Sequence, residues 1–189
     1  MVRSILPLFT AAFLASAPAL AAEPIPVAPF RSVELTAGGD VTIVPGPVQR
    51  VTLLNGSTAL TSFRVRRDGQ LEIRTSCNER CPREYNLRIE IESPTLPDVA
   101  VHAGGTIIAR PGFATQRDVS AAVDAGGTID LRAVAADNVS AAITAGGDIY
   151  VRPRLTLNAA VNAGGEVHYS GNPQVSMAVA NGGNVRRDY

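Results

Sequence analysis

The chain has 189 residues, of which 46% are hydrophobic and 18% charged, with 17 glycines, 13 prolines and no tryptophan. Its 17 basic residues, all arginine, balance 17 acidic residues, so the charge gives no indication of a nucleic-acid partner. The absence of lysine excludes a lysine nucleophile or Schiff base.

Residues 1–21 have the pattern of a secretory signal peptide. Arg3 supplies the positive charge, residues 5–15 form an apolar stretch, and Ala19-Leu20-Ala21 is a small-residue cleavage site. The apolar stretch is too short for a membrane anchor, and no later segment could cross a membrane as a helix. We therefore expect an exported protein, located in the periplasm or at the cell surface, with no membrane span after cleavage.

Residues 22–29 form a proline-rich leader, which we expect to be extended and which could cover the first part of the folded domain. Strand patterns then begin, and residues 30–189 are predicted to form one domain. Asp68-Gly69 lies between two strand patterns and is the strongest short signal for a hairpin or corner.

Cys77 and Cys81 are separated by three residues. In an exported protein, two close cysteines most simply form a disulfide bond. The alternatives are a metal site or a redox pair, but zinc needs about four ligands, and the spacing is one residue longer than in the C-x-x-C motif. We expect a disulfide, no metal site and no cofactor.

The second half of the chain is built from repeats. Four copies of one pattern begin at Val119, Val139, Leu157 and Val175, and a weaker copy ends at Ile107. Each copy contains a Gly-Gly pair, whose first glycine is at positions 104, 126, 146, 164 and 182, so the copies are 22, 20, 18 and 18 residues apart. A strand-type repeat of this length is typical of a solenoid.

Within each copy, apolar residues alternate with small or polar ones, and the glycines suit a corner between two strands. The sequence therefore predicts an all-β, single-domain parallel β-helix with coils of about 18–22 residues. An antiparallel β-sandwich with Gly-Gly hairpins is the alternative. Stacking the copies predicts two buried columns: Val101, Val123, Ile143, Val161 and Val179, and Ile107, Ile129, Ile149, Val167 and Val185.

Four stretches resemble the GIN domain family, labelled putative auto-transporter adhesin head. They are residues 30–35 with 40–43, residues 65–73, residues 94–99 and, most specifically, residues 165–173. The resemblance implies a small exported parallel β-helix whose molecular role is largely unassigned.

Two sets of residues are candidate binding surfaces. Arg110, Arg132 and Arg152 each lie five residues after the second glycine of a copy, which predicts a stack that could bind an anion, or else a solvated edge paired with acids. Ala122, Ala142 and Ala160 belong to an outward alanine column beside a serine and asparagine column. This flat face could simply stack well, or it could dock a glycan, an envelope protein or a second copy.

The sequence contains no catalytic constellation. Asp148 and Glu166 would lie on adjacent coils, at a spacing seen in glycosidases, but the rest of their column is merely polar. His102 and His168 fall in different columns and are expected at the surface. We therefore predict a non-catalytic envelope or cell-surface binding module, with a polysaccharide-cleaving enzyme as the alternative.

Overall fold

The computed structural model describes residues 22–36, 38–76 and 85–188, and all of its regular elements are β-strands. Their bounds are β1 (Glu23–Ile25), β2 (Ser32–Leu35), β3 (Asp40–Pro45), β4 (Arg50–Asn55), β5 (Thr61–Val65), β6 (Gln70–Thr75), β7 (Arg88–Ser93), β8 (Asp98–Ala103), β9 (Thr106–Ala109), β10 (Gln116–Ala125), β11 (Thr128–Ala145), β12 (Asp148–Ala163), β13 (Glu166–Tyr169), β14 (Gln174–Val179) and β15 (Asn184–Arg187). The predicted signal peptide, residues 1–21, lies outside the described residues. In the described part, no helix is long and apolar enough to cross a membrane.

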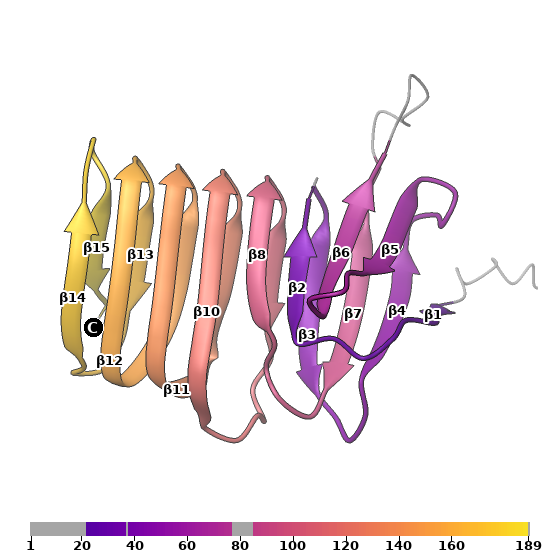
Figure 1. The fold of residues 1–189 in the computed structure, drawn as a ribbon, viewed down its shortest axis with the longest axis horizontal. Helices are drawn as coiled ribbons and strands as arrows, with labels where there is room; N and C mark the ends of the chain where they lie inside the picture. Colours follow the sequence, from indigo (N-terminus) through magenta and orange to yellow (C-terminus); the bar gives the residue numbers. More distant parts are fainter. Residues whose placement is uncertain (1–21, 37, 77–84, 189) are drawn as a thin grey trace, which may run out of the picture.

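The fifteen strands form one sheet that folds back on itself around a single core (Figure 1). In the figure, β8, β10, β12 and β14 lie in one layer, and β13 and β15 lie behind them. Buried side chains fill the space between the layers. The most buried large ones are Leu35, Ile43, Leu71, Ile73, Leu87, Ile89, Ile91, Ile107, Ile129, Leu131, Ile149 and Leu157.

The repeats pair in parallel and in the predicted register. Val123 is aligned with Ile143, and Ile143 with Val161. The second column is likewise confirmed, from Ile107 through Ile129 to Val185. Successive side chains of a strand point to opposite faces, so this register turns the branched residues of every copy toward the core.

The Gly-Gly pairs form the corners between the layers. Gly146 and Gly147 have φ angles of 77° and 104°, in the region that favours glycine. At Gly147 a Cβ atom would lie 2.7 Å from the carbonyl oxygen of Gly127 in the preceding copy. The second glycine is therefore required both by its φ angle and by the close approach of neighbouring corners.

The predicted fold class is wrong. The structure is not a parallel β-helix with uniform coils but one nearly closed, barrel-like sheet of mixed pairing. The pairs β1–β4, β4–β7 and β5–β6 are antiparallel. The chain reverses between β5 and β6 at Asp68-Gly69, where Gly69 has a φ of 78°, and such local reversals in the irregular first half interrupt the parallel order.

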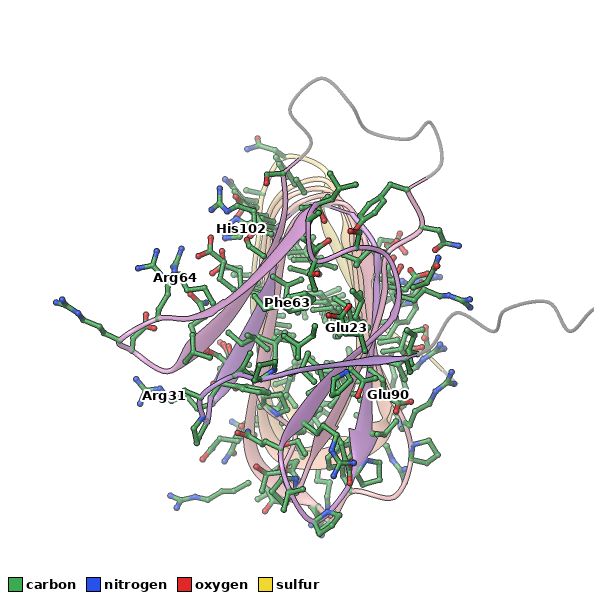
Figure 2. The ribbon with its side chains drawn as sticks, turned by 90° about the vertical axis from the view of Figure 1, so that its right-hand side faces the viewer. Glu23, Arg31, Phe63, Arg64, Glu90 and His102 are labelled. Atoms are coloured by element: carbon green, nitrogen blue, oxygen red, sulfur yellow. The ribbon has the colours of Figure 1, made fainter. Side chains whose placement is uncertain are left out.

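The antiparallel strands also close one end of the core. Figure 2 looks at this end and shows Phe63 and Glu23 lying across it. Ile25, Val27, Phe63 and Val65 are partly buried and pack against the core. The expected role of the proline-rich leader fits this arrangement, because β1 lies in the leader and pairs with β4.

Candidate functional site

One outer face of the sheet carries a row of alanines. Ala100, Ala122, Ala142, Ala160 and Ala178 occupy matched positions on β8, β10, β11, β12 and β14. The last three are exposed and the first two are half-buried. We call the outer surface around this row the flat face, and it contains the predicted residues Ala122, Ala142 and Ala160 side by side.

Polar side chains accompany the alanines. Exposed hydroxyl and amide groups form a parallel row beside them, made of Ser120, Ser140, Asn158 and Ser176. A shallow groove runs on the other side of the alanine row and is lined by Ala142, Thr144, Ala160, Asn162, Ala178 and Ala180. Methyl groups and uncharged hydrogen-bonding groups thus alternate across the face.

A charged cluster borders the flat face toward the closed end. Glu72 is 8% exposed, and Arg74 Nη2 donates to its Oε1 at 2.5 Å. This hydrogen bond, assisted by the charges of Arg66 and Arg74, holds the pKa of Glu72 below its usual value despite burial. Glu34 contacts His102 Nε2 at 3.0 Å. His102 is itself exposed at the surface, as predicted.

The opposite layer carries a ladder of three flat side chains from β11, β12 and β13. The Cζ atom of Arg132 lies 4.6 Å from the centre of the Tyr150 ring, and the rings of Tyr150 and His168 stack at 4.3 Å. Asp130 accepts hydrogen bonds from Arg132, which lower the pKa of Asp130 and raise that of Arg132. Sequence analysis missed this ladder, although Asp130, Tyr150 and His168 share one repeat position, the third after the Gly-Gly pair.

His168 is buried, so the expectation that it lies at the surface is wrong. It is 3% exposed, because Tyr150 stacks on its ring and two carboxylates contact its nitrogens. Glu166 Oε2 lies 3.0 Å from Nε2, and Asp188 Oδ1 lies 3.1 Å from Nδ1.

Asp148 and Glu166 are cross-strand neighbours, as the repeat predicts. With His168 they place three donor atoms within 4.8 Å of one another, a set that could hold a divalent cation such as zinc. However, Arg186 Nε lies 3.3 Å from Glu166 Oε2, and Asp188 holds the other side of the ring. Glu166 and His168 are thus already engaged by partners from the end of the chain, and the simplest role of the cluster is to fix β15 against β13.

The three arginines predicted to stack have different surroundings. Arg132 is engaged by Asp130 and Tyr150. A register shift after Asp130 aligns Arg152 with Ala135 instead of with Arg132. Arg110 lies just beyond β9 and donates its backbone N–H to Ile43. The column is therefore interrupted, and an anion site at these residues stays a prediction.

Cys77 and Cys81, the predicted disulfide pair, lie outside the described residues.

Comparison with known proteins bears on the second half of the chain. Residues 102–173 match the family model described as "Putative auto-transporter adhesin, head GIN domain". The resemblance to the GIN domain family is confirmed. The matched segment is less than half of the chain, and it includes β9 to β13, the most regular part of the sheet.

Solved structures show only distant likeness to this chain. A putative adhesin from Bacteroides fragilis is 17% identical, with a TM-score of 0.49. A putative adhesin from Parabacteroides merdae is 13% identical, with a TM-score of 0.46, and a putative lipid binding protein from Parabacteroides distasonis is 13% identical, with a TM-score of 0.37. Each likeness covers 89% of this chain and 96% of the other. No curated protein matches the sequence.

Proposed function

We propose that this protein is an exported, non-catalytic surface-binding module that holds its partner on the flat face. The observation that carries the proposal is the row of exposed alanines in register on adjacent strands. An ordered, uncharged and level surface is well suited to contact and poorly suited to chemistry. The adhesin-head label of the matching family supports a surface-binding role.

The pattern of the flat face favours a neutral, repeating polymer such as a glycan chain. Ala142 and Ala160 offer methyl groups to the apolar faces of sugar rings, while Ser140, Asn158 and Ser176 offer hydrogen bonds. Neighbouring strands are about 4.8 Å apart, so the same groups recur at regular intervals across the face. The alternative partner is an envelope protein, and the experiment below distinguishes it from a glycan.

The alternative of a polysaccharide-cleaving enzyme would depend on Asp148 and Glu166. These residues belong to the layer that carries β13 and β15, whereas the flat face belongs to the layer of β8, β10 and β14. A chain bound on the flat face would therefore not reach them. Glu166 is also engaged by Arg186 and His168.

The test compares three forms of the protein on a panel of bacterial polysaccharides and on an envelope extract. The double variant Ala142→Arg with Ala160→Arg places two long charged side chains on the flat face. The matched control, Val48→Arg with Leu54→Arg, adds the same charge at exposed positions of the closed half. Substitutions at exposed positions usually change stability by less than about 0.5 kcal/mol, so all three forms should be folded.

We expect the wild type and the control to bind the same polysaccharides and the flat-face variant to lose binding. Equal binding by all three forms would exclude the flat face. If the wild type captures a protein from the envelope extract but binds no polysaccharide, the partner of the flat face is a protein and not a glycan. Shortened polysaccharide products that disappear in Asp148→Asn with Glu166→Gln would establish the enzyme alternative.

A further inference from the structure

The end of the sheet formed by β14 and β15 is open. Among the described strands, β14 pairs only with β12, and β15 only with β13, so each has a second side without a paired strand. Met177 and Val179 are 56% and 43% exposed. They nevertheless occupy inward positions, since Val179 continues the column of Ile143 and Val161. Core-type side chains and unpaired backbone groups are thus exposed together, a combination that favours pairing with another strand.

The opposite end presents no open core to match this one, although β1 and β5 each also pair with a single described strand. It is crossed by β1, β4 and β5, whose antiparallel pairing and apolar side chains close the core (Figure 2). Joining two open ends in a closed pair related by a two-fold axis is therefore the arrangement that covers the exposed core-type side chains of both copies.

The two open edges differ in charge. β14, Gln174–Val179, has no charged residue and no proline, so it lacks the usual features that prevent edge pairing. On β15, Arg187 is aligned with Tyr169 and therefore follows the inward row. An inward-pointing charge of this kind opposes pairing of an edge strand with another chain. β14 has no such charge and is therefore the edge that is free to pair.

We propose that β14 pairs with β14 of a second copy of this chain, in antiparallel orientation. A neutral strand opposite itself brings no like charges together. The alternation of β14 would place Val175, Met177 and Val179 of both copies on the same inner side, where they would extend one core across the junction. Two β14 edges paired in this way would hydrogen-bond each other's unpaired backbone groups and cover each other's exposed apolar side chains.

The test is the mass of the purified full chain, measured by light scattering and sedimentation over a range of concentrations. We expect a monomer–dimer equilibrium. Met177→Lys and, separately, Val179→Lys should raise the dissociation constant by about tenfold or more, because each would bury an unpaired charge at the junction. Val48→Lys, at a similarly exposed position away from the edge, should leave the constant unchanged.

Two further variants separate this edge from other surfaces. Arg187→Ala should not weaken the dimer, and neither should Ala142→Arg, which alters the flat face only. Hydrogen exchange gives a test that uses the wild type alone. The exchange of β14 amides should slow as the protein concentration rises, because pairing would protect them. A monomer at about 100 µM, a dimer unchanged in both lysine variants, or growth beyond two copies would overturn the proposal.

Discussion

Replacing Ile143 with alanine tests the register of the repeats most directly. Ile143 is 2% exposed and lies between Val123 and Val161 in the buried column. The change removes three carbon atoms, which at about 0.8 kcal/mol each gives about 2.4 kcal/mol of lost transfer free energy. A residual cavity adds to this, so we expect a loss of about 2–5 kcal/mol in the free energy of unfolding.

The assay is urea unfolding of the full chain, compared with two control variants. Thr144→Ala changes the exposed neighbour of Ile143 on the same strand and should cost less than about 0.5 kcal/mol. Val179→Ala changes the same column at the open end, where the side chain is 43% exposed, and should cost much less than the central substitution. Equal losses for Ile143→Ala and Thr144→Ala would refute the assigned register.

Three other predictions concern single sites. Gly146→Ala should cost about 1 kcal/mol through its positive φ alone, whereas Gly147→Ala should cost more because its Cβ meets the Gly127 carbonyl; thermal melts giving the reverse order would contradict the corner geometry. The pKa of Glu72 is lowered by Arg74, so its contribution to stability should be present at neutral pH and lost as the pH falls through the lowered pKa. The stability difference between wild type and Glu72→Gln should therefore shrink as the pH falls below 4.5, the ordinary pKa of a glutamate. Cys77 and Cys81 should be bonded in exported protein, and thiol labelling that finds both free would reject the disulfide.

The repeats made the second half of the fold predictable. Because matched positions recur at 18–22 residues, the sequence alone aligned Val123 with Ile143 and Ala142 with Ala160, and both pairings are present. The first half has no such repeat, so the antiparallel pairing of β4 with β1 and with β7 was not predicted, although Asp68-Gly69 was recognised as a hairpin or corner. Pairing between β4 and β7 joins residues 33 to 42 positions apart, which local patterns do not specify.

The candidate site was partly predictable for the same reason. Rows of identical residues, such as the alanines, were recognised because the same residue type recurs at the matched position of each copy. Arg132, Tyr150 and His168 are unlike residues, and Arg132 lies two positions beyond the repeat position that Tyr150 and His168 share, so their stacking was missed. The burial of His168 depends on Asp188, which directly follows the last strand, in a contact between residues 20 positions apart in the sequence.

The two proposals together predict that pairing should strengthen binding. A two-fold axis perpendicular to the sheet at β14 would keep both flat faces on the same side, so a pair would offer one surface of twice the length. A repeating polymer long enough to reach both copies would then bind the second face at a raised effective concentration. Met177→Lys should therefore weaken binding to a long polysaccharide but not to a short fragment of it, since the variant keeps each flat face intact. If surface plasmon resonance shows the same ratio of affinities for long and short chains in wild type and variant, the flat faces do not act together, even if each proposal holds alone.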